Sequence, residues 1–286
     1  MDIFGDLEGL GIKKSDNVDI FAEEEPERRE EPVKESAKEE KILNEADYIF
    51  DKSMTCPVCG HTFKTKKVRA GKSRFLGTDS DLRPLHEGVD TVKYDTIVCL
   101  HCGYASLERM YANVTSHQAK EIREQIGYNF KGMTNAPGAY TYDEAIQRYK
   151  LTLLNCVVRK LKMSERAYVC LKIAWLYRGM GRSLEEGTEG YTRKKKECDD
   201  NEHAFITKAY EGFTIAFEKE VMPICGMDQY TLSYLMADLA RQCKDYDNAD
   251  KYAYDIIGSR AASAKVKEKA RSLHERIKQE KDTQNS

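Results

Sequence analysis

Four cysteines stand in two Cys-x-x-Cys-Gly steps, an arrangement that could hold a metal ion. The steps are Cys56-Pro-Val-Cys59-Gly60 and Cys99-Leu-His-Cys102-Gly103. Two residues between the sulfurs let both ligands of one turn reach a single ion at about 2.3 Å, and the glycine that follows can take a positive φ. We therefore predict a tetrahedral Zn²⁺ site whose ligands are Cys56, Cys59, Cys99 and Cys102.

Other chemistries fit these cysteines less well. A redox dithiol needs one such step near a β-α-β pattern, and here two Cys-x-x-Cys steps compete for that one role. A catalytic zinc ion has three protein ligands and an open position for water, whereas four thiolates close the shell. His61, His86 and His101 could each replace a thiolate, but we expect hydrogen bonding near the sulfurs or simple exposure. Four thiolate ligands suit both zinc and iron, so the sequence does not decide between these two metals.

A basic segment lies between the cysteine steps, with no carboxylate between Asp51 and Asp79. Its side chains could contact nucleic-acid phosphates, and a solvated loop is the alternative. Gly71-Lys72-Ser73 is not a phosphate loop, because that motif needs another glycine five residues before Gly71. The candidate nucleic-acid contacts are Lys64, Lys66, Lys67, Arg69, Lys72 and Arg74.

No residue is assigned a catalytic role. The chain contains no G-x-S-x-G, H-E-x-x-H or G-x-G-x-x-G fingerprint. A hydrolase or transferase site near His86 would need the nearby carboxylates to converge on it in a pocket; these are Asp79, Asp81, Glu87 and Asp90. The other cysteines lack metal spacing, which suits small core residues: Cys156, Cys170, Cys198, Cys225 and Cys243. We expect a protein that is not an enzyme.

Length and composition predict a cytoplasmic protein of two ordinary domains. The chain has 286 residues, of which 41% are hydrophobic and 33% charged. No segment approaches the roughly 20 apolar residues of a membrane-spanning helix, and the first residues are acidic where a secretory signal is basic. We expect no membrane partner. Thiols stay reduced in the cytoplasm, which favours metal binding over disulfides.

The elements that must position the cysteines change in character along the chain. Residues 1–45 are rich in Glu, Lys and Pro, which predicts a disordered acidic tail with a possible short docking helix at 3–12. Short alternating runs, including 89–98, predict strands in a zinc-ribbon-like module over 51–112. The 39 residues between Cys59 and Cys99 exceed a compact site and require a long loop.

Helical periodicity dominates residues 116–282, opened by a possible capping box of Thr115 and Gln118. Tyr142 and Tyr246 each precede an alanine by three residues, and this segment resembles tetratricopeptide repeats, although Lys244 stands where their signature glycine belongs. A generic helical bundle is the alternative. The expected class is α+β, mainly α, with helices at 116–127, 141–162, 164–180, 202–220, 228–243, 246–258 and 262–281.

Several stretches together resemble an uncharacterised bacterial family, the domain of unknown function 2225 family. They are Cys56-Pro-Val-Cys-Gly, Val68-Arg-Ala-Gly-Lys-Ser-Arg74, Asp79-Ser-Asp81-Leu-Arg-Pro84, Tyr94 and Val98-Cys-Leu-His-Cys-Gly-Tyr-Ala105. The resemblance implies a pair of metal knuckles followed by a helical, repeat-like part, with no assigned activity. It leaves the loop of Arg74, Asp79, Asp81 and Tyr94 as a partner surface or as a brace on the ribbon.

Two functional hypotheses follow from these patterns. The first is a non-enzymatic scaffold or adaptor, in which zinc stabilises the ribbon and the helical repeats bind a protein or peptide partner, because stacked helix pairs expose extended concave surfaces. The second is a nucleic-acid-binding zinc ribbon that uses the basic loop from Lys64 to Arg74.

Overall fold

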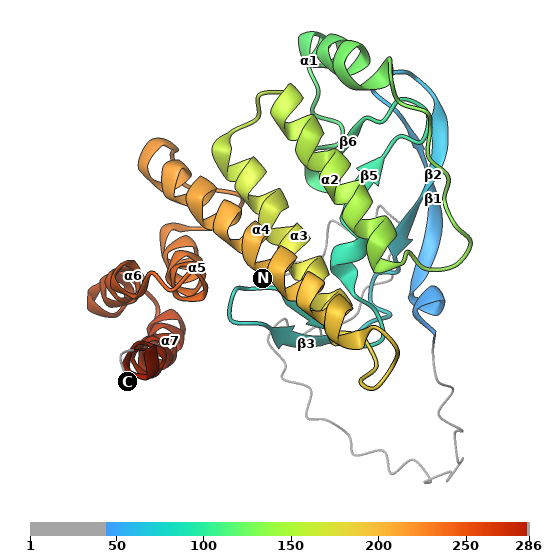
Figure 1. Cartoon of the computed structure of the whole chain (residues 1–286). Helices are drawn as coiled ribbons and strands as arrows, with labels where there is room; N and C mark the ends of the chain where they lie inside the picture. Colours follow the sequence, from blue (N-terminus) through green and yellow to red (C-terminus); the bar gives the residue numbers. More distant parts are fainter. Residues whose placement is uncertain (1–43, 285–286) are drawn as a thin grey trace, which may run out of the picture. The chain divides into compact units, whose positions relative to one another are not determined.

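The structure is a computed structural model and describes residues 44–284 (Figure 1). It is mainly helical with three small antiparallel sheets of two strands each, so the predicted α+β, mainly α class is confirmed. The predicted acidic tail, with its docking helix at 3–12, lies outside the described residues except for Asn44 and Glu45. Within the described part, no helix has both the length and the apolar character needed to cross a bilayer.

Two of the sheets are hairpins that carry the cysteine steps. Strand β1 (Ile49–Thr55) pairs with β2 (Thr62–Val68), and β5 (Thr96–Val98) pairs with β6 (Ala105–Leu107). In each hairpin the last residue of the first strand stands opposite the first residue of the second. The register therefore places one cysteine step at the tip of each hairpin.

The segment between these hairpins contains a third sheet and a correction to the sequence prediction. Strand β3 (Phe75–Thr78) pairs with β4 (Pro84–His86). The strand predicted over 89–98 is wrong for most of its length, because Thr91–Tyr94 forms a 3-10 turn, η3. The Asp90 carboxylate accepts a hydrogen bond from the Val92 amide at 3.1 Å, a local bond that favours a turn over a strand.

The first helix, α1 (Ser116–Ile122), confirms the predicted capping box. The Gln118 amide donates to the Thr115 hydroxyl at 3.2 Å, and the Thr115 amide donates to the Gln118 side chain at 3.3 Å. The helix continues as a single π-helical turn over Arg123–Gly127, so the predicted element at 116–127 is helical throughout.

Six further helices follow, and each packs against the next in the chain. They are α2 (Tyr142–Val158), α3 (Met163–Arg182), α4 (Tyr191–Lys219), α5 (Gln229–Gln242), α6 (Tyr246–Gly258) and α7 (Ala264–Gln284). Helices α3 and α4 lie side by side (Figure 1). Helix α4 begins well before the predicted start at 202. Its first turns are mostly exposed and polar, so they lack the apolar periodicity that sequence reasoning requires.

Small residues allow close helix packing where the repeat pattern predicts it. Ala145 and Ala249 are both completely buried, as expected from their places three residues after a tyrosine. Lys244 has a left-handed φ of 60°, which explains why the repeat signature has a glycine there. The amides of Lys244 and Asp245 donate back to carbonyls of α5 and end that helix.

One hydrophobic core joins the helices to the β-rich part. Its centre lies between α2, α3, α4 and α5 and includes the buried Trp175 and Leu171, as predicted for repeat core. Val92 and Leu107, from before the expected boundary near 112, pack in the same cluster. The described residues form one compact unit. Burial of this shared apolar surface fixes the two cysteine hairpins on the helices.

Candidate metal centre

The two cysteine turns have the same backbone geometry. In the first, the Cys56 amide donates to the His61 carbonyl at 2.9 Å, and the Gly60 amide donates to the Cys56 carbonyl at 2.9 Å. The second repeats both kinds of bond at Cys99 and Gly103, at 2.8 and 3.0 Å. The glycines have φ values of +76° and +72°, a conformation that side chains disfavour. These turns are therefore two copies of the same knuckle geometry.

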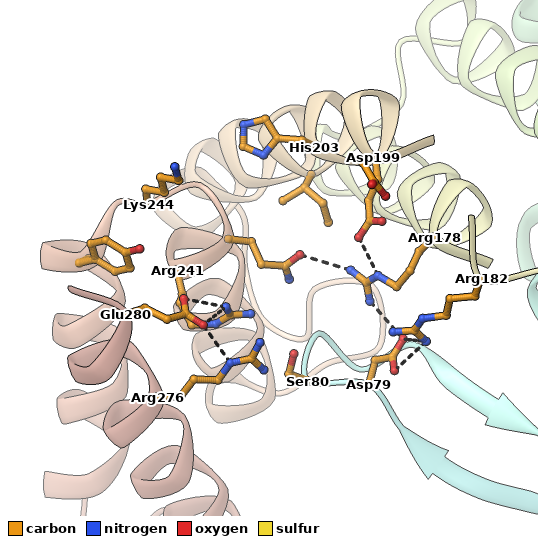
Figure 2. A pocket seen from close by; sticks show the side chains of 14 residues that line it. Asp79, Ser80, Arg178, Arg182, Asp199, His203, Arg241, Lys244, Arg276 and Glu280 are labelled. Atoms are coloured by element: carbon orange, nitrogen blue, oxygen red, sulfur yellow. Dashed lines mark hydrogen bonds and ion pairs between the residues drawn. The ribbon is translucent and has the colours of Figure 1, made fainter. Parts of the chain in front are cut away.

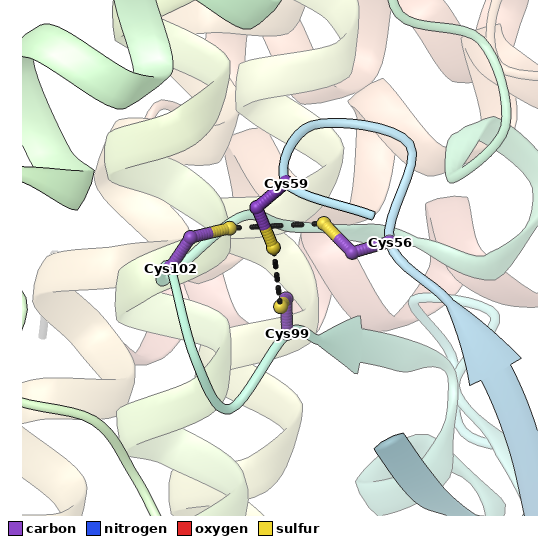
Figure 3. Close-up of side chains that lie close together, drawn as sticks. All are labelled: Cys56, Cys59, Cys99 and Cys102. Atoms are coloured by element: carbon purple, nitrogen blue, oxygen red, sulfur yellow. Dashed lines mark hydrogen bonds between the residues drawn. The ribbon is translucent and has the colours of Figure 1, made fainter. Parts of the chain in front are cut away.

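The four predicted ligands come together in space, as Figure 3 shows. Sulfur atoms of Cys56 and Cys102 are 3.7 Å apart, those of Cys59 and Cys99 are 3.6 Å apart, and all four lie within 4.8 Å of one another. A tetrahedral ion with bonds of about 2.3 Å requires sulfur separations of about 3.8 Å. The cluster can therefore hold a metal ion at its centre.

The electrostatics of the cluster favour a bound cation. Hydrogen bonding from the Cys102 thiol lowers the pKa of Cys56 to about 2, and the same contact raises the pKa of Cys102. Three of the four cysteines are buried, and only Cys59 is half-buried. Four thiolates in such a site need a divalent cation to offset their mutual repulsion.

Helical segments cover the knuckles and fix them. The Arg123 guanidinium donates to the Val58 carbonyl at 2.9 Å, and the Asn155 amide group on α2 donates to the Gly103 carbonyl at 3.0 Å. A Cβ atom at Gly103 would lie 2.8 Å from the Phe130 ring. Sequence reasoning did not find these supporting residues, because nothing in a helical pattern marks a contact to a distant turn.

Two tyrosines complete the wall beside Cys56. The Tyr104 hydroxyl donates to the Tyr111 carbonyl at 2.7 Å, and the two ring centroids are 4.9 Å apart. Burial, with the nearby negative charge of Cys56, raises the pKa of Tyr111. Its hydroxyl therefore stays protonated next to the sulfur cluster, where it can stabilise a thiolate.

The histidines near the cysteines divide into a pair and an outlier. The rings of His61 and His101 stack with centroids 3.5 Å apart and an interplanar angle of 12°. Both are exposed, as expected, and one donor atom of each lies within 4.8 Å of the Cys59 sulfur. His86 instead contacts the Phe75 ring edge-on at 5.5 Å, on the separate β3–β4 hairpin.

The basic segment is not a loop in its first half. Lys66 and Lys67 lie in β2 and are both 6% exposed. Lys66 pairs with Asp51 at 3.5 Å, and Lys67 pairs with Glu108 at 2.6 Å. Buried, neutralised lysines cannot reach a nucleic-acid backbone, so these two predicted contacts have a structural use instead.

The other four basic residues of the segment are exposed: Lys64, Arg69, Lys72 and Arg74. Arg74 pairs with Glu87 at 3.3 Å, and the Arg69 guanidinium lies 5.6 Å from the centre of the Phe50 ring. Nucleic-acid binding through this segment stays a prediction, and these four residues alone could carry it.

The acidic loop braces the β-rich part against helix α3. The Arg178 guanidinium donates to Asp79 at 3.2 Å and to Asp81 at 2.6 Å, and Asp81 is completely buried. Asp90 pairs with Arg83 at 2.7 Å. The carboxylates therefore meet arginines and do not converge on His86, as a hydrolase site there would need.

Tyr94 lies apart from this brace. Its hydroxyl donates to Glu45 at 2.9 Å, and its ring stacks on Tyr140 at 5.5 Å. Arg74, the Asp79–Asp81 pair and Tyr94 thus serve three different contacts. Of the two roles that the family resemblance leaves open for this loop, Asp79 and Asp81 fit the brace.

A charged cleft of about 560 Å³ lies beside the brace (Figure 2). Helix α3 contributes Arg178 and Arg182, and α7 contributes Arg276 and Glu280. Glu280 accepts from Arg276 at 3.0 Å and from Arg241 of α5 at 2.9 Å. Sequence reasoning missed this cleft, since its residues are far apart in the chain and resemble ordinary surface charges of separate helices.

Part of the charge in this cleft is available to a ligand. Arg182 and Arg276 keep 54% and 53% of their side chains exposed. Lys244 and His203 also line the cleft, and neither has an ion pair with any of residues 44–284. The open positions are therefore mainly basic, and Asp199, which is 53% exposed, is an acidic exception among them.

The five cysteines outside the cluster are free thiols within the helical part. Cys156, Cys170 and Cys198 are buried, while Cys225 and Cys243 are half-buried. Burial raises the pKa of Cys156 to about 12 and that of Cys170 to about 11. Such thiols are neutral and unreactive near pH 7, which agrees with small core residues.

A family model described as "Uncharacterized protein conserved in bacteria (DUF2225)" matches residues 49–277. The chain belongs to this family. The match begins at β1 and extends into α7, so both knuckles, the brace and all of the cleft lining except Glu280 fall inside the family domain. No curated protein and no solved structure matches the chain.

Proposed function

We propose that this DUF2225 protein is a non-enzymatic, zinc-stabilised adaptor whose helical part binds a protein or peptide. The observation that carries the zinc assignment is the spacing of the four sulfurs, whose closest pairs are 3.6 and 3.7 Å apart. Four thiolates suit zinc in a reducing compartment, and they fill its tetrahedral shell. An iron ion in the same shell is the alternative, and elemental analysis separates the two.

A structural role for the ion follows from what surrounds it. Each hairpin tip contributes one pair of ligands. The π-helical turn contacts the backbone of the first knuckle, and α2 contacts the backbone of the second. The strands are short, and β5 and β6 have three residues each. Isolated two-stranded hairpins are marginally stable in water, so the ion supplies the cross-link that the sheets lack.

The adaptor role is supported by the helical part and its cleft. Each of the helices from α2 to α6 packs against the next one in the chain, and Ala145 and Ala249 are completely buried at matching positions, which supports tetratricopeptide-like repeats. The cleft between α3, α4, α5 and α7 keeps Arg182, Arg276 and Lys244 accessible. A peptide segment that carries carboxylates complements these charges.

The proposal assigns no reaction to the cleft. The arginine at its base, Arg178, is held by Asp81 and Glu202 at 2.6 and 2.7 Å. These ion pairs occupy both carboxylates. A general acid or base near neutral pH needs a carboxyl of raised pKa or an accessible imidazole aligned with a nucleophile.

Charge reversal in the cleft tests the adaptor role. Tagged full-length chain is recovered from a bacterium that makes it, and co-purifying proteins are compared by quantitative mass spectrometry. A Lys244→Glu/Arg276→Glu variant should lose its partner, whereas Lys265→Glu/Lys269→Glu should retain it. The control changes the net charge of the chain by the same amount, at two exposed α7 positions outside the cleft. Equal recovery by both variants, or no partner for the wild type, would contradict the proposal.

A further inference from the structure

The stacked histidines form a feature that the zinc cluster does not use. His61 follows the first knuckle and His101 lies inside the second, so their contact depends on the two hairpins being held together. Their rings are nearly parallel, with centroids 3.5 Å apart. The Cys59 sulfur, one ring nitrogen of His61 and one of His101 all lie within 4.8 Å of one another.

Cys59 is the cluster thiol best placed to serve two ions. It is half-buried, whereas the other three ligands are buried, and the two imidazoles beside it are exposed. A divalent ion bound by four thiolates leaves a net negative charge, because four negative charges exceed two positive ones. A thiolate sulfur that binds one ion retains lone pairs, and that negative charge attracts a further cation.

We propose that Cys59, His61 and His101 form a second, solvent-facing site for a divalent transition-metal ion, with the Cys59 sulfur bridging it to the ion in the tetrathiolate cluster. Imidazole and thiolate together suit zinc. Three protein ligands at the surface leave the remaining coordination position to water. The inference rests on the proposed zinc occupancy of the first site.

The second site should bind its ion more weakly than the first. It has three protein ligands, two of them exposed side chains, while the first site has four and lies largely within the core. Its ion therefore exchanges with the surrounding solution at zinc concentrations that leave the tetrathiolate ion in place. Cys59 is the residue through which the occupancy of one site affects the other.

Zinc titration of the full-length, zinc-loaded protein tests this inference. After equilibrium dialysis against buffered Zn²⁺, the wild type should hold one tightly bound and one weakly bound ion per chain. His61→Ala/His101→Ala should keep only the tight ion. Each single variant should weaken the second ion at least about 10-fold, the effect expected even of outer-shell changes.

The control variant removes the other accessible histidines that lie beside carboxylates. His117→Ala/His274→Ala, at side chains near Glu121 and Asp250, should retain both ions. A second ion that survives in His61→Ala/His101→Ala, or disappears in the control, would overturn the inference. A wild type without the weak ion would overturn it as well.

Cobalt identifies the bridging sulfur. Co²⁺ added to zinc-loaded protein should give a thiolate-to-cobalt charge-transfer band while the zinc content stays constant, and His61→Ala/His101→Ala should abolish the band. A cobalt spectrum without thiolate character would exclude Cys59. Loss of zinc from the tight site in the histidine variant would show that an imidazole belongs to the first ion, contrary to the inference. Wild-type protein without any tight ion would refute the proposed structural zinc itself.

Discussion

Alanine substitutions at the two knuckle glycines should differ in cost, although the backbone is nearly the same at both. Gly60 and Gly103 have φ values of +76° and +72°. A Cβ atom at Gly60 meets nothing within 4 Å, whereas one at Gly103 would lie 2.8 and 2.9 Å from two Phe130 ring atoms and 3.1 Å from Ile126. Gly60→Ala thus adds only backbone strain, and Gly103→Ala adds strain and a clash.

The magnitudes separate the two variants. An alanine in the left-handed conformation costs about 1–2 kcal/mol at either position. Overpacking adds about 1–3 kcal/mol at Gly103, because Cγ of Phe130 is close to the backbone and cannot swing away freely. At about 2–4 °C per kcal/mol for a domain of this size, Gly60→Ala should lower the melting temperature by about 2–8 °C and Gly103→Ala by up to about 20 °C.

Thermal unfolding in saturating zinc measures both effects. The clash account further predicts that Phe130→Ala removes the additional cost of Gly103→Ala, so the double-mutant coupling energy should be about 1–3 kcal/mol. The same background should leave the cost of Gly60→Ala unchanged. Equal melting temperatures for Gly60→Ala and Gly103→Ala would refute the reasoning, since Phe130 and Ile126 would then not be in close contact with Gly103.

Three further predictions concern the helices, the brace and the basic segment. Lys244→Gly relieves a left-handed φ of 60° and should raise the free energy of unfolding by about 1 kcal/mol, whereas Lys251→Gly inside α6 should lower it by about 1 kcal/mol; urea unfolding measures both. Burial raises the pKa of Asp81, but hydrogen bonding and the charge of Arg178 outweigh it and hold that pKa below its ordinary value of 3.8. The ionised form therefore contributes stability above pH 3.8 that is lost as the pH falls through the folded pKa. Asp81→Asn should lower the free energy of unfolding by about 3–5 kcal/mol at pH 7 and by less in acid. Asp247→Asn, at an exposed ion pair, should change the free energy of unfolding little. A loss for Asp81→Asn that does not depend on pH would contradict the ionised Asp81–Arg178 pair. If the ribbon binds RNA or DNA, the protein should shift the electrophoretic mobility of the nucleic acid in a salt-dependent way. The shift should be lost when only the exposed cations are changed to Glu, namely Lys64, Arg69, Lys72 and Arg74. Absence of binding at low salt would eliminate nucleic-acid binding as the alternative function.

The sequence was sufficient for the features that depend on local spacing. The cysteine steps predicted which four sulfurs meet, because the ligand spacing and the following glycine are local requirements. The capping box at Thr115 and Gln118 was equally visible, as was the burial of Ala145 and Ala249. The mainly helical class followed from periodicity in the second half of the chain.

The features that the sequence did not reveal depend on contacts between distant segments. Lys66 and Lys67 look like exposed strand cations until Asp51 and Glu108 are placed beside them. Arg178 has the appearance of a surface arginine, yet it pairs with carboxylates almost a hundred positions earlier in the chain. The first turns of α4 were missed because an exposed polar helix carries no apolar period.

X-ray absorption at the metal edge, with elemental analysis of the same sample, tests the central claim most directly. After dialysis against a weak chelator, the protein should retain about one zinc ion per chain, surrounded only by sulfur at about 2.3 Å. Cys56→Ser should remove one sulfur from that shell. A folded protein without bound metal, or a shell made of nitrogen and oxygen, would contradict the tetrathiolate centre.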